Sequence, residues 1–229
     1  KSGIAKAYTS IDGWNRKLIN IEERAANSRH LQELFELTVI QYKELNDCRL
    51  ELLLLKGVWD ISAYVLYQFR SWMKSSFISV DIDTLVEEIK KIRKTVQSLN
   101  VKVRAWNCFK GLQDEVQNML TSLPLVQELR SQAMRDRHWN ELLKETNTTG
   151  MINPTDPNFS VKELLSLGLH DHVETVRNIV NKATKELQIE TALVKIDAVW
   201  KDMSFIFEHN EELQCMLLGP VDDQIEELE

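Results

Sequence analysis

Residues 45–73 read LNDCRLELLLLKGVWDISAYVLYQFRSWM, and this stretch decides the fold class. Its apolar residues recur at alternating steps of three and four, which is the spacing of a continuous helical seam. The seam consists of Leu45, Cys48, Leu52, Leu55, Trp59, Ser62, Leu66, Phe69 and Met73. Further apolar residues widen the stripe, so the helix must bury more than one side. We therefore predict a bundle helix within about residues 39–77, in which Gly57 marks a bend or a close helix crossing.

Similar patterns flank this helix on both sides. Residues 4–37 repeat apolar side chains on one face, although Asn27-Ser28 is also consistent with a break near residues 28–30. Asp81 offers an N-cap for a second seam that extends from Leu85 to Trp106. Gly111 interrupts the pattern, which then resumes. Pro124 ends it or begins a new turn.

Shorter elements are expected in the second half of the chain. A helix over residues 135–146 precedes a turn-rich stretch at 147–158. Ser160 to Glu163 has the spacing of a capping box, and a long helix follows over residues 172–200. Alternating apolar residues around a polar tip predict a small β-hairpin within 203–218, and a last helix begins near Asp222.

Composition agrees with a mainly α, elongated helical bundle or rod. The 229 residues include only seven glycines and four prolines, too few breakers for a sandwich or barrel. A net charge of −7 argues against a nucleic-acid binder, and no apolar stretch is long enough to span a membrane. Three scattered cysteines predict neither a disulfide framework nor a zinc site, and they suit a reducing compartment. The first residue is not Met and the last residues continue a helical pattern, which predicts a piece of a longer polypeptide.

Motifs for chemistry are scarce. The sequence contains no P-loop, no GxGxxG, no HExxH and no GxSxG, so we expect no catalytic, cofactor-binding or metal-binding residues. His170-Asp171-His172 suits a helix cap or a surface position better than a metal clip, with Asp171 as the cap. Glu186 and Glu190 lie four apart, which fits a salt-bridged helix face better than an acid–base pair, and Lys182 pairs with Glu186.

The densest polar and aromatic cluster is MRDRHW at residues 134–139. It is compatible with an anion site at a helix N-terminus. It is equally compatible with Trp139 plugging a core while Arg135, Asp136 and Arg137 form ion pairs with neighbouring helices. The physics favours the second interpretation, because the planar guanidinium of Arg binds carboxylates bidentately.

Several motifs in order resemble the linker region of dynein heavy chains. They are NML at 118–120, LPLV at 123–126, the RHW of residues 137–139, the Leu-rich stretch 159–169, ATKELQIE at 183–190 and Trp200. Upstream, IDGWN at 11–15 and LFEL at 34–37 are similar to the neck of axonemal members. The sequences VRAW at 103–106 and MLTSL at 119–123 resemble the outer-arm beta type. The residues that carry the linker motif are Arg135, Arg137, His138, Trp139, Lys185, Glu186, Glu190 and Trp200.

The resemblance implies a force-transmitting role. Residues 1–79 would be tail or neck helices, and 80–229 the N-terminal part of a linker that joins the tail to an AAA+ ring. ATP and Mg would belong to that downstream ring, so the segment itself would not be an enzyme. Implied partners are the rest of the heavy chain, other heavy, intermediate and light chains, and microtubules through the stalk, with no nucleic acid or membrane.

The implied location is the cytoplasm and cytoskeleton, in the axoneme of a cilium or flagellum. A lever also needs a hinge, for which Gly111, Pro124 and residues 147–158 are candidates. The alternative function is a helical scaffold or adaptor that binds partner helices.

Overall fold

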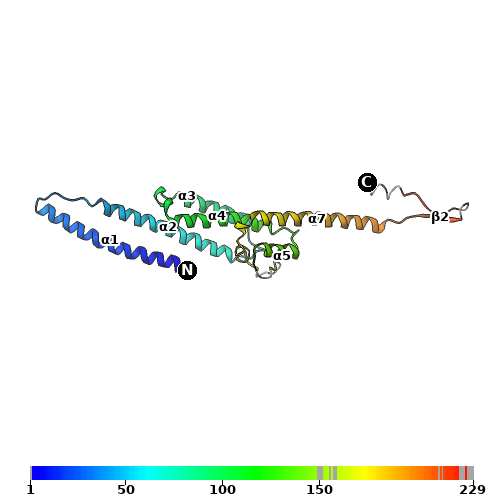
Figure 1. Ribbon diagram of the computed structural model, residues 1–229, viewed down its shortest axis with the longest axis horizontal. Coiled ribbons are helices and arrows are strands. Elements are labelled where there is room, and N and C mark those ends of the chain that lie inside the picture. The colour runs from blue at the N-terminus through cyan, green and yellow to red at the C-terminus, as the bar shows by residue number, and fades with distance from the viewer. Residues whose placement is uncertain are drawn as a thin grey trace.

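The computed structural model describes residues 2–148, 152–154, 156, 159–210, 212, 214–221 and 225. The protein is mainly α and strongly elongated (Figure 1). Its helices are α1 (Ser2–Leu34), α2 (Lys43–Met73), α3 (Ile82–Gln97), α4 (Asn107–Glu128), α5 (Asp136–Glu145), α6 (Val161–Leu165) and α7 (Val173–Asp202). Two short 3-10 turns, η1 (Val101–Ala105) and η2 (Leu169–Asp171), connect them. No helix among the described residues has an apolar segment long enough to cross a membrane.

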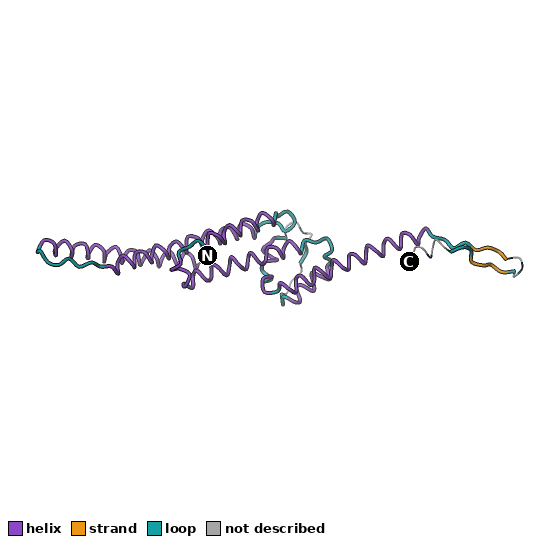
Figure 2. Tube along the Cα trace, turned by 90° about the horizontal axis from the view of Figure 1, so that it is seen from above, coloured by secondary structure: helices purple, strands orange, loops and turns teal. Residues whose placement is uncertain are grey.

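The helices form two antiparallel hairpins and one projecting rod. The α1–α2 hairpin occupies one end, and the α3–α4 hairpin packs beside α2. From the far side of this body α7 extends as a single helix toward a two-stranded sheet, as both Figure 1 and Figure 2 show. The predicted elongated helical bundle is confirmed.

Two expectations about helix boundaries differ from the structure, one at the end of α3 and one inside α1. The seam expected from Leu85 to Trp106 is broken, since α3 ends at Gln97 and η1 turns the chain back into α4. The Asn100 side chain accepts a hydrogen bond from the amide of Lys102 at 2.9 Å, which fixes this turn. Val103 is nevertheless fully buried, so the 3-10 turn keeps the apolar spacing without remaining α-helical. The break considered near residues 28–30 is also absent, because α1 runs through it.

Gly111 and Pro124 both lie inside α4, so the predicted interruption and end are wrong. Proline in a helix interior costs about 3 kcal/mol, because it removes an amide donor and crowds the preceding turn. Its neighbours Leu123, Leu125 and Val126 are almost completely buried, and their packing offsets that cost. Gly57 lies within α2, and a Cβ added there would have no neighbour within 4 Å, so no close helix crossing occurs at this residue.

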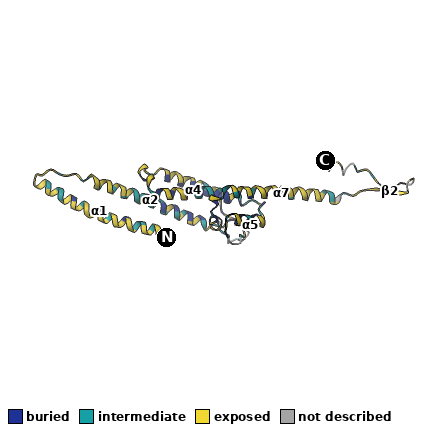
Figure 3. Ribbon diagram, viewed as in Figure 1, coloured by how far each residue is buried: buried dark blue, intermediate teal, exposed yellow. Residues whose placement is uncertain are grey.

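The hydrophobic core lies where the two hairpins meet the short helices (Figure 3). It extends from Val58 in α2 to Ile179 in α7 and includes residues on both sides of position 79. In contrast, among the side chains of α1 that the structure describes, only Ile11, Leu18 and Ala25 are buried. Most of α1 and the outer part of α7 are therefore exposed (Figure 3).

Two further expectations concern the connections. Asp81 caps α3 as predicted, since its Oδ1 accepts from the amide of Thr84 at 3.2 Å. Ser160 precedes α6, but its side chain makes no capping hydrogen bond, so the predicted capping box is wrong. The backbone at Ser160 is instead extended and forms a bridge with Ser76.

The predicted β-hairpin is confirmed. β1 (Phe207–Asn210) pairs antiparallel with β2 (Cys215–Leu218), with Phe207 opposite Leu218. Of the helix expected from Asp222, Ile225 is described and is helical, and its amide donates to the carbonyl of Val221 at 3.0 Å. The other residues of that expected helix lie outside the described part of the chain.

Candidate functional site

Helix α5 presents different side chains to the core and to α7. It has only ten residues, and its inward face consists of His138, Trp139, Leu142 and Leu143, all buried. The side chains of Arg135 and Arg137 are exposed. This division lets one short helix fill the core and bind a neighbour at the same time.

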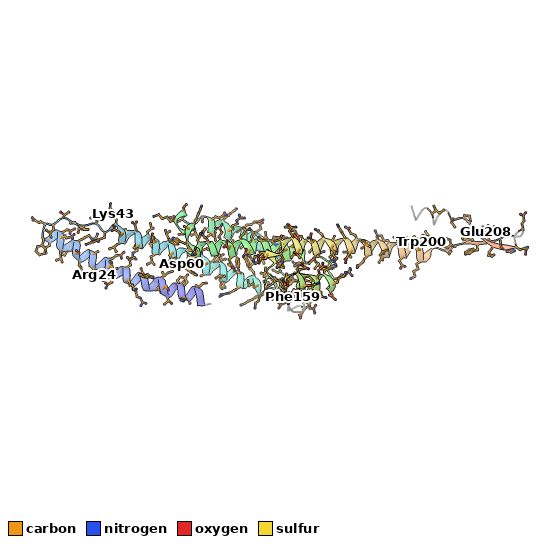
Figure 4. The ribbon with its side chains drawn as sticks, viewed as in Figure 1. Arg24, Lys43, Asp60, Phe159, Trp200 and Glu208 are labelled. Atoms are coloured by element: carbon orange, nitrogen blue, oxygen red, sulfur yellow. The ribbon has the colours of Figure 1, made fainter. Side chains whose placement is uncertain are left out.

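Trp139 fills the core at the junction of α2, α5 and α6, as predicted. Its side chain is 3% exposed and meets Phe77 edge to face, with ring centroids 6.2 Å apart. Phe77 in turn contacts Phe159 in the same geometry at 5.6 Å. Phe159, labelled in Figure 4, lies beside α5, so one aromatic cluster joins three segments distant in sequence.

Five residues form what we call the α5–α7 clasp: Arg135, Arg137, His138, Glu186 and Glu190. Nε of Arg137 donates to Oε2 of Glu186 at 2.8 Å, and its Nη2 donates to Oε1 of Glu190 at 3.1 Å. Nη2 of Arg135 donates to Oε2 of Glu190 at 3.2 Å. Because Glu186 and Glu190 lie one turn apart, a single guanidinium spans both and fixes the rotation of α7 against α5.

His138 connects the clasp to the core. Its Nδ1 accepts from the backbone amide of Arg135 at 3.1 Å, and its Nε2 lies 3.0 Å from Oε2 of Glu186. Since a main-chain amide always donates, Nδ1 carries no proton, and the proton on Nε2 points at Glu186. The imidazole is fully buried, so this neutral tautomer links the start of α5 to α7 without burying a net charge.

The electrostatics favour an ion-pair cluster over an acid–base site. Hydrogen bonds from Arg137, and then from His138, lower the pKa of Glu186. Arg137 and then Arg135 lower the pKa of Glu190 in the same way. A general acid working near neutral pH needs a raised carboxyl pKa, which is the opposite of what this environment produces.

A second ion pair lies beside the clasp. Nζ of Lys182 donates to Oε2 of Glu141 at 2.9 Å, so the predicted pairing of Lys182 with Glu186 is wrong. Lys182 pairs with Glu141 in place of Glu186 because α5 packs beside α7. The sequence of α7 alone does not indicate this neighbour.

Three of the predicted residues lie outside this network. Asp136 makes no ion pair among the described residues, although it occupies the first turn of α5. Lys185 is exposed on α7, and Trp200 lies near the outer end of the same helix (Figure 4). The structure therefore brings together five of the eight linker-motif residues in the clasp and places Trp139 in the core beneath it.

The His170-Asp171-His172 stretch is a surface connection. Nε2 of His170 lies 3.4 Å from Oδ2 of Asp171, and η2 ends at Asp171. His172 is the N-cap residue of α7, so the prediction that Asp171 caps this helix is wrong. Within the described ranges, no group of His, Cys, Asp and Glu side chains is arranged to hold a metal ion. The three cysteines are free.

Long-range contacts that sequence reasoning missed hold the rest of the body. Arg130, just after α4, donates to the carbonyls of Val80 and Ile78 at 2.8 and 2.5 Å. Nε of Arg49 on α2 donates to Glu22 of α1 at 2.9 Å. These partners are 27 to 52 residues apart, so no local sequence pattern indicates them.

Comparison with known proteins identifies the family. Residues 45–229 match the family described as dynein heavy chain, N-terminal region 2. The chain belongs to the dynein heavy chains. It is 38% identical over 227 residues, 99% of its length, to the flagellar outer arm dynein beta chain of Chlamydomonas reinhardtii. It is 34% identical over 222 residues, or 97% of its length, to the ciliary dynein beta chain of Tripneustes gratilla.

A further relative is axonemal dynein heavy chain 11 of Sus scrofa, 35% identical over 222 residues. The chain spans about 5% of the length of each of these relatives. The match confirms the resemblance to axonemal dynein heavy chains, outer-arm beta chains among them. The ciliary, flagellar and axonemal names agree with the axonemal location that the resemblance implies.

Proposed function

We propose that this segment is a force-transmitting lever between the tail and the AAA+ ring of an axonemal dynein heavy chain. The observation that carries the proposal is a helix fixed at one end and free along the rest of its length. The 30 residues of α7 correspond to about 45 Å at 1.5 Å per residue. A helix of this length transmits a movement of the body to its far end only if its base does not turn or slide relative to that body.

The base of α7 is fixed in two ways. Val176, Ile179 and Ala183 are buried against the body, and the clasp follows directly at Glu186 and Glu190. Beyond Glu190 the helix leaves the body, and Leu193 is 59% exposed. Packing resists translation of the base, while the forked hydrogen bonds of the clasp resist rotation.

The proposal assigns roles to the two parts of the chain. Residues 1–79 belong to the neck and 80–229 to the first part of the linker. The segment itself catalyses nothing, and the ATP and Mg of the motor bind in the downstream ring. The rest of the heavy chain, other dynein subunits and, through the stalk, microtubules are the partners, in the axoneme. Of the three hinge candidates, the proposal takes the connection from α5 to α6, because Gly111 and Pro124 lie within the continuous helix α4.

The test uses the full-length heavy chain with Arg135→Gln and Arg137→Gln. Both changes remove a clasp charge and keep a long polar side chain. We expect microtubule gliding velocity to fall by about half or more while basal ATPase activity is retained, because the ring is intact but the lever base is loose. The matched control is Lys195→Gln with Lys201→Gln, which removes two charges from the outer part of α7. Unchanged velocity in the clasp variant, or an equal loss in the control, would contradict the lever.

A further inference from the structure

An apolar groove of about 500 Å³ runs between the two helices of the α1–α2 hairpin. Trp14, Leu18 and Ile21 of α1 line it together with Leu52 and Leu55 of α2, and Trp106 of the α3–α4 connection borders it as well. Trp14 is 62% exposed, so a large aromatic ring stands at the groove in contact with solvent. Exposed apolar surface of this concave form is typical of a site that receives a helix.

The connection that supplies Trp106 is also strongly basic. Residues 89–113 contain seven Lys and Arg and no acidic residue, in a chain whose net charge is −7. The seven are Lys90, Lys91, Arg93, Lys94, Lys102, Arg104 and Lys110, and all are exposed. One end of the α3–α4 hairpin is therefore positively charged, whereas the net charge of the whole chain is negative.

The basic residues nearest in sequence to Trp106 lie in and just after the turn that supplies this tryptophan to the groove. Lys102 and Arg104 lie in η1, which contacts α2, and the amide of Lys110 donates to the carbonyl of Trp106 at 3.1 Å. Lys102 and Lys110 make no ion pair among the described residues. Acidic neighbours do exist elsewhere on the hairpin: Glu87 pairs with Lys90 at 2.8 Å, and Asp114 and Glu115 follow one turn later on α4.

Two charges belong to the groove lining itself. Nζ of Lys17 on α1 lies 4.4 Å above the ring of Trp14, which places a cation at the groove beside the aromatic ring. Glu51 of α2 is the acid in the lining. The charged residues of the lining, Lys17 and Glu51, therefore balance each other, and the excess positive charge lies in η1 beside Trp106.

We propose that this groove binds an amphipathic helix of another polypeptide, with an acidic edge facing the Trp106 side. The apolar face of that helix covers Trp14, Leu52 and Trp106, its acids face Lys102 and Lys110, and one base faces Glu51. The proposal goes beyond the lever function, since it assigns a partner-binding site to the neck half of the chain. Charge complementarity selects the ligand, because the η1 turn next to Trp106 is basic while the chain as a whole is acidic.

The experiment measures fluorescence anisotropy of two labelled synthetic peptides of about 21 residues, long enough for a helix of some 30 Å. Both carry leucines at alternating steps of three and four. One has glutamates along one edge and a lysine on the other, and its partner peptide has lysines in place of the glutamates. The protein variants are Lys102→Gln with Lys110→Gln, Trp14→Ala, and the matched control Lys195→Gln with Lys201→Gln on α7.

The local charge predicts that the acidic peptide binds at least about tenfold more tightly than the basic peptide. The Lys102 and Lys110 variant weakens that binding by about fivefold or more, Trp14→Ala weakens it too, and the α7 control stays within about twofold. The net charge of −7 alone predicts the reverse preference, so tighter binding of the basic peptide overturns the proposal. Equal binding of both peptides, an equal loss in the α7 control, or a dimer in sedimentation velocity that Trp14→Ala abolishes also overturns it.

Discussion

Replacing Trp139 with alanine tests the core on which the clasp rests. The Trp139 side chain is 3% exposed and contacts Phe77 edge to face. Burial of an aromatic side chain removes about 150–250 Å² from water, worth about 4–6 kcal/mol at roughly 25 cal/mol per Å² as an upper limit. The edge-to-face contact adds about 0.5–1.5 kcal/mol. Measured Trp→Ala costs in cores of about 3–5 kcal/mol set the expected loss of unfolding free energy.

That loss should be visible by both urea denaturation and thermal unfolding. For a chain of this size, each kcal/mol shifts Tm by about 2–4 °C, so Trp139→Ala should lower Tm by about 6–20 °C. The matched control is Trp14→Ala, because Trp14 is 62% exposed and its removal should cost less than about 1 kcal/mol.

Circular dichroism and intrinsic tryptophan fluorescence should report the same transition in both variants. A Tm shift below about 2 °C for Trp139→Ala would refute the reasoning, because it would mean that the cavity collapses without loss or that Trp139 is not packed as described. An equal loss in both variants would also refute it, since the two positions differ chiefly in burial.

Three further predictions concern charge and backbone. Because the pKa of Glu186 and Glu190 is lowered in the fold, their contribution to stability is present above the ordinary value of 4.5 and is lost as pH falls below it. In the double variant Glu186→Gln with Glu190→Gln, the unfolding free energy measured in urea should therefore decrease less steeply than in the intact chain as the pH falls below about 5. The same slope in both proteins would count against the clasp. The hydrogen bond from Tyr8 to Asp60 raises the pKa of Tyr8 to about 12, so this contact stabilises the fold below the ordinary value of 10.0 and is lost as pH rises through 12. Ultraviolet titration should show one tyrosine still protonated near pH 11, and Asp60→Asn should abolish that delay. Gly57→Ala should stabilise the chain by about 0.4–1 kcal/mol in urea denaturation, because an added Cβ meets nothing within 4 Å, and destabilisation would contradict an unstrained helix there.

Sequence periodicity predicts this fold well wherever a helix has one apolar face and solvent on the other. The existence of α2 and of the long α7 helix follows from spacing alone, and the hairpin at Phe207 follows from the change of period. The buried stripe of α2 differs from the predicted seam, because Val58, Val65 and Trp72 are buried while Cys48 is exposed. The pattern fails at η1, because Val103 continues the apolar spacing through a turn that is no longer α-helical. It also fails at Pro124, where buried neighbours outweigh a local helix breaker.

The sequence predicts that the clasp residues form ion pairs, but it does not predict which residues pair with which. The guanidinium groups of residues 135 and 137 indicate carboxylate partners, and the i,i+4 acids of α7 indicate a charged face. Nothing in either stretch says that the two faces meet, since they are about 50 residues apart and only the fold of the intervening segments aligns them. The same limitation hid the contact of Lys182 with Glu141 and the clamp made by Arg130.

The central claim is that α7 is a rigid arm with a fixed base, and a distance distribution across that base tests it most directly. Spin labels at Lys110→Cys in the body and Val194→Cys on the outer part of α7 are both exposed, in a background where Cys48, Cys108 and Cys215 are serine. Pulsed electron paramagnetic resonance should give one narrow distance peak in the intact chain, and Glu186→Gln with Glu190→Gln should broaden it. A broad or multiple distribution in the intact chain would contradict the account.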